Sequence, residues 1–239
     1  MTRTLLFRHY PTKLGSVLSI VIAALLIPGL TSPASPIPQD PENVTSMQLS
    51  EEQKSTGELI KHGIRNAQEG NYEKAIYDYN QALHVDPRDA EAYFLRGVAR
   101  SKLGDERGAN EDFEKVLRLR IEKLGQTIRR NPEDFIAHIQ RGYSRYESGD
   151  QQGAIHDFTV AIRLRPAIAD AYFYRGNAHY RKGDKQAAIQ DYDRALQIDT
   201  KRADVYVARA VVRLELGDKP GAVEDFDKAR NINPSDELH

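Results

Sequence analysis

A repeat of 34 residues runs through most of the chain and limits the folds that the chain can adopt. Alanine recurs at five corresponding positions, Ala75, Ala109, Ala154, Ala188 and Ala222. The spacings between them are 34, 45, 34 and 34 residues, so one interval is 11 residues longer than the period. A fixed period of about 20 to 50 residues is typical of one supersecondary unit stacked several times. The sequence therefore predicts five stacked copies of one unit.

The residues around each alanine repeat in the same frame and predict a pair of helices. A small residue stands twelve positions earlier, at Gly63, Gly97, Gly142, Gly176 and Ala210. Glycine stands five positions earlier, at Gly70, Gly104, Gly149, Gly183 and Gly217, and Asp or Asn follows it each time. An aromatic residue stands four positions later, at Tyr79, Phe113, Phe158, Tyr192 and Phe226. The first small residue lets two helices approach closely, the second glycine ends a helix, and the aromatic ring fills the space between helices.

The frame predicts where the two helices of each unit lie. The first helices are expected at 56–69, 90–103, 134–148, 169–182 and 203–216. The second helices are expected at 72–85, 106–130, 151–164, 185–198 and 219–232. Ser50 and Gln53 form a potential capping box, which would start the first helix near Glu51. The eleven extra residues, 124–134, make about three helical turns, so they are expected to lengthen the second helix of the second copy.

This frame resembles the tetratricopeptide repeat (TPR) family over residues 56–236. The fourth position of that family's motif is often Trp, whereas here it holds Leu59, Tyr93, His138, Tyr172 and Tyr206. The resemblance implies an all-α fold, a right-handed α-solenoid of five antiparallel helix-turn-helix repeats. The array is expected at 51–236, with repeats at 56–89, 90–123, 135–168, 169–202 and 203–236 and the extension at 124–134.

The residues before the array are expected to export the chain or to anchor it. Arg3, Arg8 and Lys13 precede an apolar run that ends at Pro28 and Gly29, which is the order of a secretory signal. Residues 1–34 are therefore predicted to be a cleaved signal peptide or an N-terminal membrane anchor in which residues 14–30 form the tether. The array would then lie outside the cytoplasm, in a periplasmic, lumenal or secreted location. Residues 35–50 hold Pro36, Pro38 and Pro41 and are expected to form a disordered linker.

Composition and motifs argue against several classes of function. The chain has no cysteine, which excludes disulfides, thiolate metal sites and a cysteine nucleophile. The chain as a whole has a net charge of −1, and a generally basic nucleic-acid-binding protein is disfavoured. No HExxH, GxSxG or phosphate-binding glycine loop occurs. We expect neither an enzyme nor a cofactor or metal site.

Two rows of charge run in register through the repeats. The seventh position holds His62, Arg96, Arg141, Arg175 and Arg209, and the twenty-third holds Asp78, Asp112, Asp157, Asp191 and Asp225. Arginine can pair a carboxylate through two parallel hydrogen bonds. We therefore expect each pair to hold its two helices together rather than to bind a ligand.

The resemblance implies that the first helices line a concave groove that holds a protein or peptide partner. Family contacts at the second, fifth, ninth, twelfth and thirteenth repeat positions nominate Phe94, Tyr143, Tyr146, Phe173, Asn177, Tyr180 and Arg181 as partner-binding residues. Ile60 and Ile64 replace the Lys and Asn with which some members clamp a chaperone carboxylate, so that ligand is rejected. The alternative is that several of these aromatic residues only pack between repeats.

The sequence thus predicts a protein-protein interaction scaffold in an extracytoplasmic compartment. An alternative is a membrane-associated assembly factor that uses the basic segment 115–130. The sequence also leaves open whether the chain forms a homodimer. Arg230 replaces the apolar residue of the other repeats on the face where a sixth repeat would stack, so the last helix is expected to cap the array.

Overall fold

The structure is a computed structural model that describes residues 45–233, with side chains from Thr56 onward. The predicted signal or anchor segment at 1–34 lies outside the described residues, as do residues 35–44 of the predicted linker. Within residues 45–233, no helix combines the length and the apolar character that crossing a membrane requires.

The described residues form ten helices and contain no strand. The helices are α2 (Thr45–Gln68), α3 (Tyr72–Val85), α4 (Ala90–Lys102), α5 (Glu106–Arg130), α6 (Phe135–Ser148), α7 (Gln151–Leu164), α8 (Ala169–Lys182), α9 (Lys185–Ile198), α10 (Ala203–Glu215) and α11 (Lys219–Ile232). They form the five expected hairpins, so the all-α fold is confirmed. From α3 onward, every helix begins and ends within one residue of the predicted boundary.

The first helix begins earlier than the sequence predicted. α2 starts at Thr45, so Ser50 lies inside the helix rather than at its start, and residues 45–50 are helical rather than part of a linker. No proline or glycine stands between Pro41 and Gly57 to stop the helix from extending toward the N-terminus. The capping-box prediction is therefore wrong.

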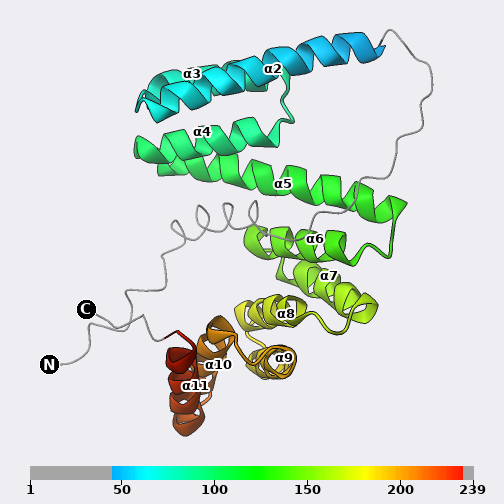
Figure 1. Cartoon of the computed structure of the whole chain (residues 1–239), viewed down its shortest axis with the longest axis vertical. Coiled ribbons are helices and arrows are strands. Elements are labelled where there is room, and N and C mark those ends of the chain that lie inside the picture. The colour runs from blue at the N-terminus through cyan, green and yellow to red at the C-terminus, as the bar shows by residue number, and fades with distance from the viewer. Residues whose placement is uncertain (1–44, 234–239) are drawn as a thin grey trace, which may run out of the picture. The chain divides into compact units, whose positions relative to one another are not determined.

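The chain divides into two compact units, Met1–Leu119 and Arg120–His239. In the first unit, α2 packs against α3 and α3 packs against α4. In the second unit, each helix from α6 to α11 packs against the next one along the chain (Figure 1). Contacts also join α6 to α8 and α8 to α10, so the first helices of successive hairpins lie side by side within this unit.

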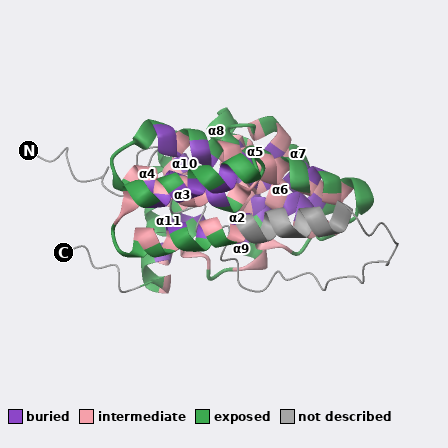
Figure 2. Cartoon of the chain, turned by 90° about the horizontal axis from the view of Figure 1, so that it is seen from above, coloured by how far each residue is buried: buried purple, intermediate pink, exposed green. Residues whose placement is uncertain are grey.

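Small residues and aromatic rings form the core of each hairpin. The five repeated alanines that define the frame are all buried. Figure 2 shows buried residues in purple along the helices. A Cβ atom added at Gly63, Gly97, Gly142 or Gly176 would lie 2.5 to 2.9 Å from the ring of the repeat's aromatic residue, which confirms the predicted close approach. The five glycines between the two helices of each hairpin have φ between 79° and 92°, the left-handed conformation expected at a helix end.

The eleven inserted residues lengthen α5, which is one helix of 25 residues. The insertion also keeps the contact between repeats in register. Arg96 donates to Asn80, Arg175 to Thr159 and Arg209 to Asp193, so each arginine reaches a side chain sixteen residues earlier in the preceding second helix. For Arg141 the residue sixteen positions earlier is Gly125, and a Cβ atom there would lie 3.7 Å from Arg141 Nη1. The three added turns therefore place a later part of α5 beside Arg141 of α6. In the other repeats, the second helix of the preceding hairpin lies at the corresponding position.

Gly125→Ala should stabilise the chain by about 0.5–1 kcal/mol, because glycine within a helix costs that much relative to alanine. The new methyl group would meet Arg129 Nη1 and Arg141 Nη1 at 3.7 Å, which is ordinary van der Waals contact. The free energy of unfolding from a urea titration measures this effect. A loss of stability would show that the arginines leave no room for the methyl group.

Candidate functional site

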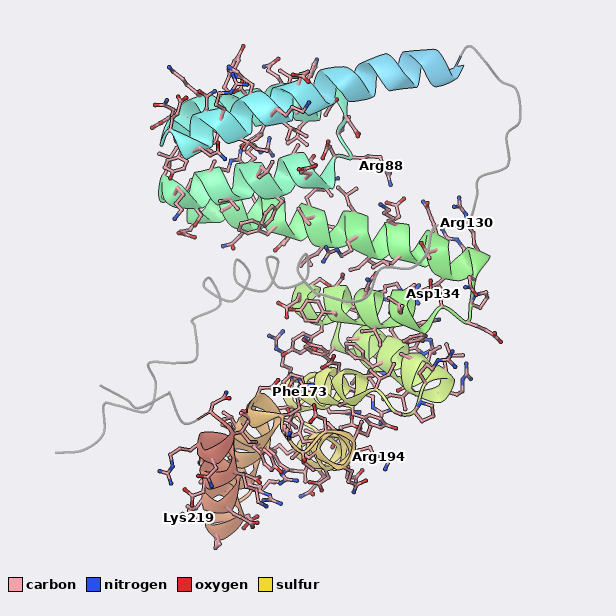
Figure 3. The ribbon with its side chains drawn as sticks, in the orientation of Figure 1. Arg88, Arg130, Asp134, Phe173, Arg194 and Lys219 are labelled. Carbon is pink, nitrogen blue, oxygen red and sulfur yellow. The ribbon has the colours of Figure 1, made fainter. Side chains whose placement is uncertain are left out.

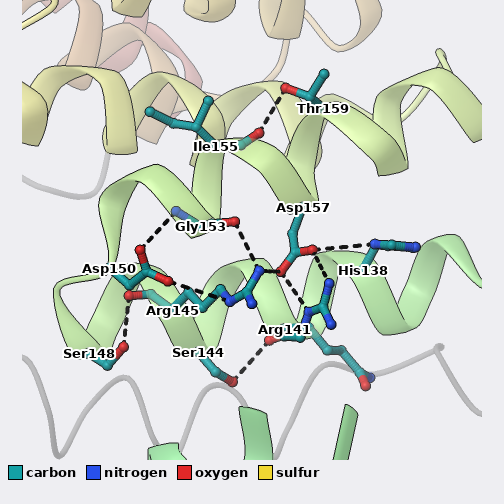
Figure 4. Close-up of polar contacts among 11 residues, drawn as sticks. His138, Arg141, Ser144, Arg145, Ser148, Asp150, Gly153, Ile155, Asp157 and Thr159 are labelled. Carbon is teal, nitrogen blue, oxygen red and sulfur yellow. Dashed lines mark hydrogen bonds and ion pairs between the residues drawn. The ribbon is translucent and has the colours of Figure 1, made fainter. Parts of the chain in front are cut away.

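The paired charges between the first and second helices are structural, as predicted. Asp157 is fully buried, and Arg141 donates to it from Nε over 2.9 Å and from Nη2 over 2.6 Å (Figure 4). Arg175 makes the same two-pronged contact with Asp191, and Arg209 makes it with Asp225. In the first unit Arg96 holds Asp112 in this way, and His62 Nδ1 lies 2.7 Å from Asp78 Oδ2.

A second row of side chains, which sequence reasoning missed, donates hydrogen bonds to four of the five buried aspartates. Arg145 Nη1 lies 2.8 Å from Asp157 Oδ2 and also donates to the carbonyl oxygen of Gly153. Arg100 and Arg213 make the corresponding contacts with Asp112 and Asp225, and Asn66 donates to Asp78. These residues stand four positions after the first row, on the same helix face, and this spacing is the signal that could have revealed them. In four of the five hairpins, the carboxylate therefore accepts or shares hydrogen bonds with two side chains of the first helix.

The nominated residues of α6 and α8 join successive first helices of the second unit. The Arg181 guanidinium lies 3.8 Å from the centroid of the Tyr146 ring, and its Nη1 donates to the Tyr146 carbonyl oxygen over 3.1 Å. The Tyr180 hydroxyl donates to Glu215 of α10 over 2.6 Å. The Tyr143 ring meets Tyr174 of α8 edge to face, with 5.1 Å between centroids. We call this side of the three helices the first-helix surface. It carries Tyr143 and Tyr146 on α6, Tyr180 and Arg181 on α8, and Glu215 on α10.

Phe173 and Asn177 lie closer to the core than the other nominated residues. The Phe173 ring lies 6.1 Å from that of Tyr192 in α9 and packs against the core cluster of the last two hairpins (Figure 3). Asn177 Oδ1 accepts a hydrogen bond of 2.7 Å from the Tyr192 hydroxyl. The amide nitrogen is the part of Asn177 that is suited to a ligand.

Phe94 belongs to the first unit, unlike the other nominated residues. It is half-buried in α4, and its ring lies 6.0 Å from that of Phe113 in α5. The structure therefore brings together six of the seven nominated residues within the second unit, and Phe94 lies in the other unit.

Burial controls the ionisation of the tyrosine-rich part of the second unit. Burial raises the pKa of Tyr143 well above its usual value, and the nearby Glu147 adds to this effect. Burial likewise raises the pKa of Tyr174 and of the Glu147 carboxyl group. In α10, the hydrogen bond from Tyr180 lowers the pKa of Glu215, and Lys185 contributes to this shift. Tyr143 and Tyr174 therefore stay neutral at physiological pH.

The exposed apolar residues of α10 extend the first-helix surface. Val207 and Leu214 stand at the fifth and twelfth positions of the last repeat, and 36% and 45% of their surfaces are exposed. In the described residues, no group of three or more His, Asp or Glu side chains is arranged to hold a metal ion. The chemistry of this surface is thus aromatic and apolar, with one exposed guanidinium at Arg181 and a carboxylate at Glu215.

Three family models match the chain and identify its repeats. A TPR repeat model matches residues 66–104, and two tetratricopeptide repeat models match residues 90–120 and 139–203. The chain belongs to the tetratricopeptide repeat family.

The relatives share the repeats rather than a whole architecture. The chain is 36% identical over 66 residues to Tetratricopeptide repeat protein 36 of Danio rerio, a match that covers 28% of this chain and 35% of that protein. It is 31% identical over 65 residues to a tetratricopeptide repeat and J domain-containing co-chaperone of Cryptococcus neoformans, covering 27% of this chain and 12% of that protein. The chain thus spans about a third or less of these curated relatives.

A solved structure of MamA from Desulfovibrio magneticus RS-1 is 21% identical to the chain. The match covers 77% of this chain and 98% of that one, with a TM-score of 0.49.

Proposed function

We propose that the chain is a protein-protein interaction scaffold whose first-helix surface binds a peptide segment of a protein partner. The row of contacts between successive first helices carries the proposal. Tyr146 with Arg181, and Tyr180 with Glu215, hold polar and aromatic groups in fixed positions across α6, α8 and α10. Binding to such a preorganised surface costs less side-chain entropy than binding to loose side chains.

The residues of this surface suit an extended or helical peptide. Leu214 and Val207 are exposed and would bury apolar side chains of the peptide. The rings of Tyr146 and Tyr180 offer flat contact area, a residue type enriched among binding hot spots. The Asn177 amide and the Arg181 guanidinium can donate to carbonyl or carboxylate oxygens.

Selection of peptides from a displayed random library on the immobilised chain tests this function. Leu214→Ala should weaken binding of a selected, fluorescein-labelled peptide by about tenfold or more, because one buried leucine contributes about 1.5–3 kcal/mol. Fluorescence anisotropy measures the dissociation constant.

Leu216→Ala is the matched control, since Leu216 is exposed to a similar extent, 42%, but lies two residues further on, about 200° around the helix axis. Equal dissociation constants for the two variants would place binding elsewhere.

The proposed location is outside the cytoplasm, and the support comes from the sequence. Arg3, Arg8 and Lys13 precede the apolar run that is typical of an export signal. N-terminal sequencing of the mature chain after cell fractionation tests this. A new N-terminus near residue 35 in an extracytoplasmic fraction supports a cleaved signal, an intact N-terminus in the membrane fraction supports an anchor, and a cytoplasmic chain contradicts both.

A further inference from the structure

One arginine in the repeated row lacks the third acceptor that its counterparts have. In addition to holding their buried aspartates, Arg96, Arg175 and Arg209 donate from Nη1 to Asn80, Thr159 and Asp193. Arg141 uses Nε and Nη2 on Asp157 in the same way. Its Nη1 lies 3.7 Å from the position that a Gly125 Cβ would take, and glycine has no side chain to accept the hydrogen bond. Within residues 56–233, no hydrogen bond joins Arg141 Nη1 to an acceptor, whereas Nε and Nη2 both donate to Asp157.

A second guanidinium converges on the same place. Arg129 Nη1, like Arg141 Nη1, lies 3.7 Å from the position that a Gly125 Cβ would take. Arg129 is exposed, and no ion pair joins it to another described side chain. In the other repeats this place holds the acceptor oxygen of an exposed or half-buried side chain. Both arginines thus direct a donor toward a position where an oxygen is expected.

We infer that Arg129 and Arg141 form a carboxylate-binding site over Gly125, which takes an aspartate or glutamate side chain of a partner protein. The partner supplies the acceptor that Asn80, Thr159 and Asp193 supply in the other repeats. Two guanidinium groups give charge-assisted hydrogen bonds, which are about twice as strong as neutral ones. The Asp157 carboxylate holds Arg141 in place from the opposite side, so the guanidinium is already oriented for its ligand.

This site is separate from the first-helix surface. It is formed by the seventh repeat position of α6 and by the end of α5, whereas the nominated peptide-binding residues occupy the fifth, ninth, twelfth and thirteenth positions. The inference therefore stands whether or not a peptide binds to the first-helix surface.

A fluorescein-labelled hexaglutamate peptide is the probe, and anisotropy at low ionic strength gives its dissociation constant. Arg129→Ala should weaken binding by about tenfold or more, because a hydrogen bond to a charged group contributes about 1.5–3 kcal/mol. Arg130→Ala is the matched control, since Arg130 is the adjacent exposed arginine of the same helix and its removal changes the net charge equally.

Two changes at Gly125 separate the site from general electrostatic attraction. Gly125→Asp should provide an internal carboxylate for Arg129 and Arg141, so peptide binding should fall by about tenfold while the melting temperature rises above that of Gly125→Ala. Gly125→Ala should bind the peptide like the unaltered chain. Equal weakening by Arg129→Ala and Arg130→Ala, or no measurable binding to the unaltered chain, would overturn the inference.

Discussion

Asp157→Ala is expected to lower the free energy of unfolding by about 3–5 kcal/mol, the range for removing one partner of a buried ion pair. Asp157 is fully buried and accepts hydrogen bonds from Arg141 and Arg145. Without the carboxylate, two partly buried guanidinium groups lose their counter-charge. Urea denaturation followed by circular dichroism measures the change.

Asp227→Ala is the control for this prediction. Asp227 pairs with Arg230 on the exposed side of α11, and both side chains are at least half exposed. Exposed pairs contribute about 0–1 kcal/mol, so this variant should be close to the unaltered chain. Similar losses from the two aspartates would mean that the buried row does not hold the hairpins together.

Gly176→Ala is expected to destabilise the chain by about 1–3 kcal/mol, the usual cost of overpacking a core. A Cβ atom at Gly176 would lie 2.7 Å from Tyr192 Cε1 and 3.2 Å from Asp191 Cβ. The Tyr192 ring cannot move easily, because it is 1% exposed and its hydroxyl is bonded to Asn177. Thermal and urea unfolding measure the loss.

Gly57→Ala shows what the same change does where there is room. Gly57 lies in α2, and nothing stands within 4 Å of its added Cβ atom, so this variant should gain about 0.5–1 kcal/mol from helix propensity. The last repeat offers a natural comparison: Ala210 replaces the glycine there, and its aromatic partner Phe226 is 37% exposed. A gain at Gly176 equal to that at Gly57 would refute the close approach of the helices.

The hairpins could be predicted from the sequence because each boundary has a local cause. Gly149 and Gly183 end their helices in a left-handed conformation, and Asp150 and Asp184 cap the next helices by accepting backbone hydrogen bonds. The effect of the eleven-residue insertion was also predictable, since about three full turns lengthen a helix without changing which way it faces. The start of α2 was not, because no such residue marks it.

The contacts of the candidate surface could not be predicted from single positions. Repeat position placed Tyr180 and Arg181 on the first helices, but their bonds to Glu215 and Tyr146 depend on the spacing between neighbouring repeats. The predicted capping role of Arg230 is also incomplete. Arg230 is exposed as expected, yet Val223 and Phe226 of the same helix expose apolar surface.

The central claim is that a protein segment binds along α6, α8 and α10, and photo-crosslinking tests it most directly. A benzoylphenylalanine replaces either Val207 of α10 or Val223 of α11, two exposed valines of the same hairpin. A library-selected peptide is then irradiated with each variant, and adducts are read by mass spectrometry. The account predicts an adduct from position 207 and little from position 223, and the reverse pattern would contradict it.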